Sequence, residues 1–178
     1  MSILIQASPL GPLTLVSCEG QLVGCYFATS DFSQRQRAEY VEDSAANDLV
    51  LRAACQELEA YFARSLTQFT IPVAPRGTEF QRSVWQALLD IPFGKTVSYA
   101  FVAKQVGKPT ALRAIGAAIG KNPLGILIPC HRVIGAYGAL TGFAGGLSRK
   151  RYLLAHEQVH LIDRIDSGSV KPTARLMT

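Results

Sequence analysis

The sequence predicts an α+β fold in which strands come first and helices follow, and three observations lead to this prediction. Short apolar or alternating runs, separated by turns that contain Pro or Gly, occupy the N-terminal part of the chain. A helical stripe of apolar residues comes next, and the second half consists mainly of further helical segments. The length of 178 residues suits one ordinary domain or two small lobes, and 48% hydrophobic against 17% charged residues indicates a globular protein.

The first lobe is expected to be a small antiparallel sheet with one helix. Turn residues at Pro9-Leu10-Gly11-Pro12 and Glu19-Gly20 divide the apolar runs, which predicts hairpin-linked strands. Apolar residues at helical spacing predict a helix after the polar segment 31–47, and an extended crossover follows it. We therefore expect an N-terminal α/β lobe over residues 1–76. The predicted elements are the strands Ile3–Ile5, Leu13–Cys18 and Leu22–Phe27 and the helix Leu49–Phe62.

The second lobe, over residues 77–163, is expected to be mostly helical. Thr78 and Gln81 fit a capping box at the start of its first helix. Two short helices follow, Ser98–Val106 and Ala111–Gly120, and Thr110 is the expected cap of the second. A tight glycine-containing turn joins them, as in a helix-turn-helix, although many helix pairs that bind no DNA share this pattern.

The C-terminal part is expected to contain a glycine-rich loop and one more helix. Five glycines in the twelve residues from Gly135 to Gly146 predict a loop that allows close backbone approach. A final helix is predicted over Ser148–Leu161, and residues 164–178 are expected to form a loose tail.

The run Ile128-Pro129-Cys130-His131-Arg132-Val133 places a thiol directly beside an imidazole. The thiolate is the nucleophilic form of cysteine, and a nearby base is the usual means of generating it at neutral pH. Adjacent residues do not face each other on a helix or strand, so Cys130 and His131 need a turn or an intervening water to exchange a proton. Glu157 is a candidate to orient His131, as the third member of a triad does. The alternatives are a buried, inert thiol and a solvated helix carboxylate.

The segment Ala111–Gly120 is rich in Ala and Gly and carries one arginine, Arg113. A helix of small residues can lie deep in a DNA groove, and an arginine on it could replace a nucleotide extruded from the base stack. Tyr99 is placed on the same DNA face. Core packing of the helix and an ordinary surface charge at Arg113 are the alternatives. The net charge of +5 and the pI near 9.2 favour an anionic partner without requiring one.

Several motifs together resemble the methylated-DNA–protein-cysteine methyltransferases, also called O6-alkylguanine-DNA alkyltransferases, in their stand-alone bacterial form. The run from Ile128 to Val133 matches the alkyl-acceptor motif of that family, and the resemblance extends in the correct order from about Phe80 to Glu157. The other matching motifs are Phe80-Gln81-x-x-Val84-Trp85, Ile91-Pro92-x-Gly94-x-x-x-x-Tyr99, Arg113-Ala114-x-Gly116, Asn122-Pro123, Gly142-Phe143-x-Gly145-Gly146 and Leu153-Leu154-x-His156-Glu157.

The resemblance implies a ribonuclease H-like N-terminal lobe and a C-terminal winged helix-turn-helix lobe. It also implies DNA repair by direct reversal. The alkyl group of O6-alkylguanine, and of O4-alkylthymine, would move irreversibly to Cys130 in a single turnover, after the base has been flipped out of double-stranded DNA bound through its minor groove.

The resemblance further implies a role for each matched residue. His131 would take the thiol proton through a water, Glu157 would hold His131, and Asn122 would brace the turn before Cys130. On the DNA side, Tyr99 would contact the flipped guanine and its phosphate, and Arg113 would be the arginine finger. The backbone carbonyls of Cys130 and Val133 would bind the guanine amino group. Four further residues would contact the base or the DNA: Ala114, Phe143, Ala144 and Gly145. Phe143 stands where tyrosine is frequent, and Ala144 where some relatives have serine.

Other properties are expected from what the sequence lacks. No secretory signal is visible and no apolar run approaches the roughly 20 residues of a membrane span, so we expect a cytoplasmic protein. The four cysteines form no CxxC pair and no histidine precedes His131, so we expect no metal and no cofactor. We also expect a monomer without an obligate protein partner.

Two other functions remain open at this point. The first is a cysteine hydrolase that uses Cys130, His131 and Glu157, and the second is a helix-turn-helix module that binds DNA without chemistry. Known cysteine–histidine dyads bring the two residues from separate elements, which argues against the hydrolase. Stoichiometric, irreversible reaction with O6-benzylguanine is expected only of the repair protein.

Overall fold

The computed structural model describes residues 1–27, 48–158 and 176, which fall into two compact units. Within the described part, the first unit comprises residues 1–27, 48–76, 123–127 and 176, and the second comprises residues 77–122 and 128–158. The loop expected at 31–47 and most of the tail expected at 164–178 lie outside the described residues. The lobe limits 1–76 and 77–163 stay predictions.

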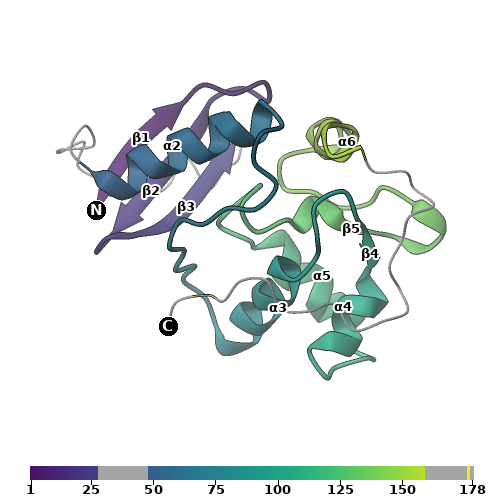
Figure 1. The fold of residues 1–178 in the computed structure, drawn as a ribbon. Helices are drawn as coiled ribbons and strands as arrows, with labels where there is room; N and C mark the ends of the chain where they lie inside the picture. Colours follow the sequence, from purple (N-terminus) through teal and green to yellow (C-terminus); the bar gives the residue numbers. More distant parts are fainter. Residues whose placement is uncertain (28–47, 159–175, 177–178) are drawn as a thin grey trace. The chain divides into compact units, whose positions relative to one another are not determined.

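The first unit is an antiparallel three-stranded sheet covered on one face by a helix (Figure 1). The strands β1 (Ser2–Gln6), β2 (Leu13–Cys18) and β3 (Gln21–Phe27) pair in sequence order, and β2 is buried along nearly its whole length. Helix α2 (Leu49–Phe62) turns one face inward, with Leu51, Ala54, Leu58 and Tyr61 buried. The predicted strands and helix of this part are confirmed: β2 reads as a short apolar run because both of its faces are buried, and α2 has helical spacing because it buries one face.

The second unit is mostly helical. Its helices are α3 (Glu79–Leu89), α4 (Tyr99–Gln105), α5 (Leu112–Gly120) and α6 (Leu147–His156). The capping box of Thr78 and Gln81 is present at the start of α3. The indole of Trp85 donates a buried hydrogen bond of 2.9 Å to the carbonyl of Ala118, which ties α3 to α5.

A short parallel pair that the sequence did not predict brings two parts of the second unit together. Strand β4 (Val97–Ser98) pairs with β5 (Val133–Ile134), with Val97 opposite Val133. A strand of two residues is too short to show an alternation of apolar and polar residues, so the sequence pattern could not predict β4 and β5. The pairing places the start of α4 beside the residues that follow Cys130.

Two predicted helix boundaries are wrong. The N-cap of α5 is Ala111, without a side-chain cap, because the Ala111 N–H is already bonded to the carbonyl of Lys108 and Thr110 lies inside the preceding turn. Helix α6 ends at His156 rather than at residue 161. Gln158 adopts a φ of 55°, and its N–H bonds to the carbonyl of Ala155, which closes the helix.

The chain makes a strained excursion just before Cys130. Residues 123–127 belong to the first unit, where Cys25 exchanges backbone hydrogen bonds with Pro123 and Gly125 at 2.8 and 3.0 Å. The N–H of Leu127 then bonds to the carbonyl of Gly125, a γ-turn centred on Ile126 with a φ of 72°. A β-branched residue rarely adopts positive φ, so the turn stores strain at this point.

The β2–β3 hairpin yields the first prediction. Glu19 and Gly20 form its two-residue loop with φ values of 52° and 74°, the signs that a type I′ turn requires. Glu19→Asn should stabilise the fold by about 0.5–1 kcal/mol, because Asn tolerates the left-handed region better than Glu does. Urea unfolding would measure the change, and a Glu19→Asn variant less stable than the parent would contradict the turn assignment.

Candidate active site around Cys130

Cys130 is the first residue of a short 3-10 turn, η2 (Cys130–Arg132). Because of this turn, the side chains of Cys130 and His131 point in different directions. The turn follows a second γ-turn, centred on Pro129, in which the Cys130 N–H bonds to the carbonyl of Ile128 at 2.8 Å. Cys130 stays partly exposed, whereas His131 and Arg132 are buried. The turn therefore leaves part of Cys130 exposed and directs the imidazole of His131 into the interior, so the two adjacent side chains have different surroundings.

Asn122 lies at the end of α5 and braces the segment that leads to the thiol. Its Nδ2 donates a hydrogen bond of 2.8 Å to the carbonyl of Ile128, across the excursion of residues 123–127. The Asn122 side chain also hydrogen-bonds the Cys130 thiol. One amide therefore links the end of α5 to the residues on both sides of Pro129.

His131 faces a buried carboxylate at the C-terminal end of α6. His131 Nε2 lies 2.8 Å from Glu157 Oε1, and the side chain of Glu157 is fully buried. The guanidinium of Arg132 forms a bidentate interaction with the same carboxylate. Its Nε donates to Oε2 at 2.9 Å, and its Nη2 donates to Oε1 at 3.0 Å. The backbone N–H of Gly94 adds a further bond of 3.2 Å.

These contacts fix the protonation states of the pair. Burial opposes the charge on Glu157, but His131 and Arg132 outweigh this and hold the pKa of the carboxyl well below its usual range. Burial lowers the pKa of His131, only partly opposed by Glu157. A neutral imidazole beside an acceptor-only carboxylate must carry its proton on Nε2. The buried Nδ1 then keeps a free lone pair, and it has no hydrogen-bond partner among the described residues.

The Cys130 thiol needs that base. Burial raises the pKa of the thiol, although the hydrogen bond from Asn122 and the positive charge of Lys150 partly oppose the rise. The thiol is therefore protonated at neutral pH, and its activation requires proton removal. A neutral imidazole with an open Nδ1 is chemically suited to accept this proton.

Lys150 is a buried cation that the sequence analysis missed, as it missed Arg132. Lys150 Nζ donates to the carbonyls of Val133 at 2.6 Å and Thr141 at 2.9 Å, and it has no ion-pair partner within the described residues. Burial lowers its pKa to about 8. The run Arg149-Lys150-Arg151 suggests a solvated charge cluster. Leu153 and Leu154 follow residue 150 at i+3 and i+4, and residues at this spacing share one face of a helix. This spacing was the signal that places Lys150 on the inward face of α6.

Tyr99 is the first residue of α4 and is half-buried beside this cluster. Its hydroxyl donates a hydrogen bond of 3.3 Å to the carbonyl of Thr141, the same oxygen that Lys150 contacts. The structure thus brings Cys130, His131, Glu157, Asn122, Tyr99 and Val133 into one neighbourhood. In the glycine-rich loop, Phe143 is half-buried, Ala144 is exposed and Gly145 is buried.

Arg113 and Ala114 lie elsewhere, on the exposed face of α5. Beside Leu112 and Arg113 that face carries Ala and Gly, and a Cβ added at Gly116 or at Gly120 would meet nothing within 4 Å. Glycine inside a helix costs about 1 kcal/mol relative to Ala. Since nothing within the described structure fills the space at these positions, their smallness leaves room for an external surface.

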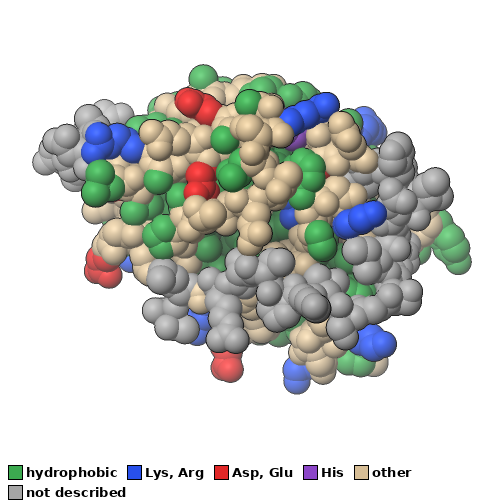
Figure 2. All heavy atoms as spheres, viewed as in Figure 1, with side chains coloured by type: hydrophobic (Ala, Val, Ile, Leu, Met, Phe, Trp, Pro, Cys, Tyr) green, Lys and Arg blue, Asp and Glu red, His purple; other side chains and the backbone are tan. Residues whose placement is uncertain are grey.

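The second unit also carries most of the positive charge. Residues 77–158 contain ten Lys or Arg residues against three Asp or Glu residues. Figure 2 shows Lys and Arg side chains around α6 on the face in view. This excess suits a polyanionic partner.

Two classes of feature are missing from the part of the chain that the structure describes. It holds no group of three His, Cys, Asp or Glu residues that could bind a metal ion. It also holds no helix that is long and apolar enough to cross a membrane.

Family models identify both parts of the chain. The model for the 6-O-methylguanine DNA methyltransferase DNA-binding domain matches residues 79–159, and the model for the ribonuclease-like domain of the same proteins matches residues 4–75. The chain belongs to the 6-O-methylguanine DNA methyltransferase family. The predicted family and the predicted α+β fold class are therefore confirmed.

Relatives of this methyltransferase family extend over nearly the whole chain. The methylated-DNA–protein-cysteine methyltransferase of Methanosarcina acetivorans is 45% identical over 84% of this chain and 94% of its own length. That of Mycobacterium bovis is 46% identical over 85% of this chain and 88% of its own. The crystal structure of Mycobacterium tuberculosis OGT in complex with DNA matches with a TM-score of 0.81 at 44% identity, covering 89% of this chain and 93% of that one.

The shared carboxylate yields a prediction for Arg132. Arg132→Met should raise the pKa of His131, because the repulsion from Arg132 disappears and Glu157 then faces His131 alone. It should also destabilise the fold by about 3 kcal/mol, because a buried ion pair is broken. NMR titration of the His131 ring measures the shift, with Arg151→Met on α6 as a control that leaves Glu157 untouched. A His131 pKa unchanged in Arg132→Met would contradict the proposed coupling.

Proposed function

We propose that this chain, a DNA-repair methyltransferase by its family, transfers the alkyl group of O6-alkylguanine irreversibly to its own Cys130, once per chain. The observation that carries the assignment to Cys130 is the neutral, buried His131, which is held by Glu157 and has an open Nδ1 next to a partly exposed thiol. The remaining described cysteines, Cys18, Cys25 and Cys55, lie in the other unit. Burial raises the pKa of Cys25 to about 12, which makes it a poor nucleophile.

The proposed reaction is an in-line displacement at the alkyl carbon. His131 takes the Cys130 proton through a water molecule, and the sulfur forms a bond to the alkyl carbon as the bond from carbon to guanine O6 breaks. The electron pair of that bond stays with the base, which takes up the proton that His131 has removed, through water, and remains in the DNA as guanine. The product is a thioether, so the protein acts as a reagent consumed in one turnover.

The surrounding groups suit recognition of the flipped base. The carbonyls of Cys130 and Val133 are proposed to accept hydrogen bonds from the guanine amino group. Lys150 uses one lone pair of the Val133 carbonyl and thereby leaves the other for this purpose. Tyr99 contacts the base and its phosphate, and Phe143 offers a stacking face without a hydroxyl. Ala144 and Gly145 act through their backbone, and O4-alkylthymine is a second substrate of the same pocket.

The exposed face of α5 is proposed to enter the minor groove of double-stranded DNA. Arg113 then takes the place of the extruded nucleotide, and Ala114 and the open positions at Gly116 and Gly120 allow close approach. The relative solved as a complex with DNA supports DNA as the partner. We further propose a monomer that acts in the cytoplasm without a metal, a cofactor or an obligate protein partner.

The acceptor assignment predicts a strict stoichiometry. Titration of the protein with excess O6-methylguanine duplex should add one methyl group per chain, on the peptide that contains Cys130. Cys130→Ser should abolish the transfer while leaving duplex affinity nearly unchanged, because phosphate contacts supply most of that affinity. Cys55→Ser, which removes a partly exposed thiol of the other unit, is the matched control and should react as the parent does.

The two competing functions give different results in the same titration, in which the lesions left in the duplex and the intact mass of the protein are both measured. A hydrolase would clear more lesions than there are protein molecules. A module without chemistry would show no change in its mass. Either result with the parent protein would overturn the assignment.

The arginine-finger role of Arg113 predicts a loss that depends on the substrate. Arg113→Ala should slow repair of a methylated duplex while leaving the reaction with free O6-benzylguanine unchanged, because only the duplex requires base extrusion. Single-turnover rates on both substrates measure the difference, with Arg82→Ala on α3 as control. Equal losses on the two substrates would point to a folding defect instead.

A further inference from the structure

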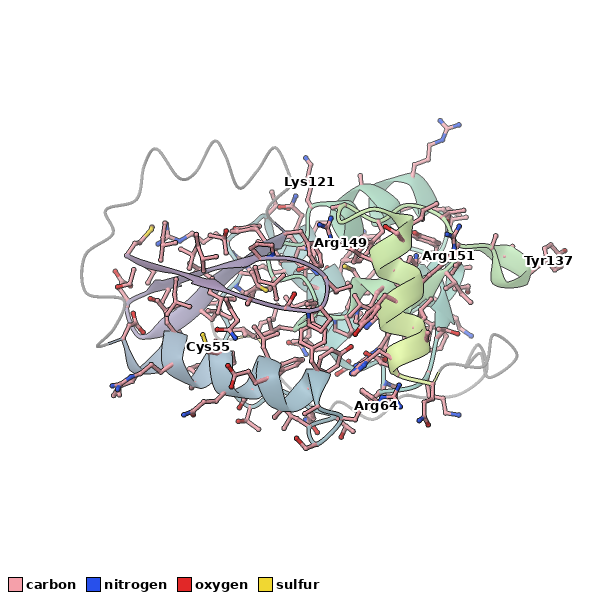
Figure 3. All side chains as sticks on the ribbon, turned by 90° about the horizontal axis from the view of Figure 1, so that it is seen from above. Cys55, Arg64, Lys121, Tyr137, Arg149 and Arg151 are labelled. Atoms are coloured by element: carbon pink, nitrogen blue, oxygen red, sulfur yellow. The ribbon has the colours of Figure 1, made fainter. Side chains whose placement is uncertain are left out.

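Tyr137 is the most exposed large hydrophobic residue of the described structure. It lies in the 3-10 turn η3 (Ala136–Gly138), in the glycine-rich loop between β5 and α6. Its relative exposure is 104%, whereas the next most exposed large hydrophobic residue, Leu49, reaches 73%. Figure 3 shows the side chain at the outer tip of this loop, directed away from α6. Single exposed aromatic residues are common, so exposure alone assigns no role.

The backbone at Tyr137 supplies a second, independent observation. Its φ of 56° and ψ of 26° place it in the left-handed region, where Gly, Asn and Asp are the usual occupants. A bulky aromatic residue is disfavoured there, and burial of the ring offers no compensation at this exposure. The fold would therefore be more stable with Asn at this position. A strained and fully exposed aromatic ring is therefore a candidate for a contact outside the chain.

Hydrogen bonds within the loop hold the backbone at Tyr137 in place relative to the site. Gly135 donates to the carbonyl of Ala139 at 2.7 Å, and Ala139 donates to that of Ala136 at 3.1 Å, which closes the tip. A Cβ at Gly135 would lie only 3.0 Å from the Ala139 oxygen, so the tip is tightly packed. Further along, the Thr141 carbonyl is held by both Lys150 and Tyr99. The tip is thus anchored to the residues that surround Cys130.

We propose that Tyr137 is a DNA-contact residue whose ring packs on a deoxyribose and whose hydroxyl donates a hydrogen bond to a phosphate near the lesion. The same loop carries Phe143, and its anchor at Thr141 is shared with Tyr99, so this contact would continue the DNA surface of the proposed function, on which the inference rests. The unit around it is strongly basic, which favours an anionic partner, such as a phosphate backbone, over a basic or an apolar one. A phenol has an apolar body and a polar tip, which suits the sugar and phosphate of a nucleotide.

The test is a substitution that should move stability and binding in opposite directions. Tyr137→Asn should raise the melting temperature, because it relieves the left-handed strain, and should weaken binding to an unmodified duplex by roughly tenfold or more, the scale of one lost hydrogen bond to a charged group. Its reaction with free O6-benzylguanine should stay unchanged. The slope of log affinity against log salt should also stay unchanged, because no cation is removed.

Two further variants separate strain from contact. Tyr137→Phe keeps the ring and the strain but loses the hydroxyl, so its melting temperature should match the parent and its duplex affinity should fall part of the way. Glu19→Asn relieves the same kind of strain in the first unit, so it should raise the melting temperature without changing duplex affinity.

Three results would overturn the proposal: a Tyr137→Asn variant that binds duplex as tightly as the parent, one that loses its reaction with O6-benzylguanine in parallel, or a changed salt slope. Failure of the parent protein to transfer an alkyl group would instead refute the proposed function. Duplex affinity would still decide the role of Tyr137 in that case.

Discussion

Glu157 carries its carboxylate into the interior of the second unit, and the geometry around Cys130 depends on how that charge is compensated. The carboxylate accepts hydrogen bonds from His131, from both edges of the Arg132 fork and from the backbone of Gly94. These donors come from the η2 turn and from the loop after α3, so one buried charge joins three separate parts of the chain. Removal of the carboxylate would leave a buried guanidinium unpaired, which costs several kcal/mol.

The same contacts make the site sensitive to acid. The pKa of Glu157 is depressed in the folded state, so the stability it contributes is present above its unfolded pKa and is lost as pH falls toward the folded value. His131 is neutral when folded, because its pKa is lowered, whereas the unfolded chain binds a proton at this histidine below about pH 6.5. Both effects favour the unfolded chain in acid. The buried pair of His131 and Glu157 therefore accounts for both properties: the open Nδ1 that can accept a proton, and the loss of stability in acid.

The sequence predicted the elements that apolar runs and turn residues mark locally, and it failed where tertiary contacts decide. Strand β2 and helix α2 have the predicted bounds, and the capping box of Thr78 is formed as predicted. Thr110 is a residue type that often caps helices, but it lies inside the turn that precedes α5, so Ala111 occupies the N-cap position. Arg132 and Lys150 were overlooked because charged side chains usually lie in solvent. Their burial depends on acceptors 25 and 17 residues away in sequence, which no local pattern contains.

Two residues in the left-handed region, Ile126 and Tyr137, show how strain distinguishes an internal role from an external one. A non-Gly residue in that region costs about 1–2 kcal/mol. Ile126 is only 1% exposed, and burying such a side chain contributes about 1.5–3 kcal/mol, so the chain itself offsets the strained turn that leads to Cys130. Tyr137 has the same backbone cost and no burial to offset it. The compensation for Ile126 lies inside the fold, whereas the described structure offers none for Tyr137, which fits the proposed contact of its ring with DNA.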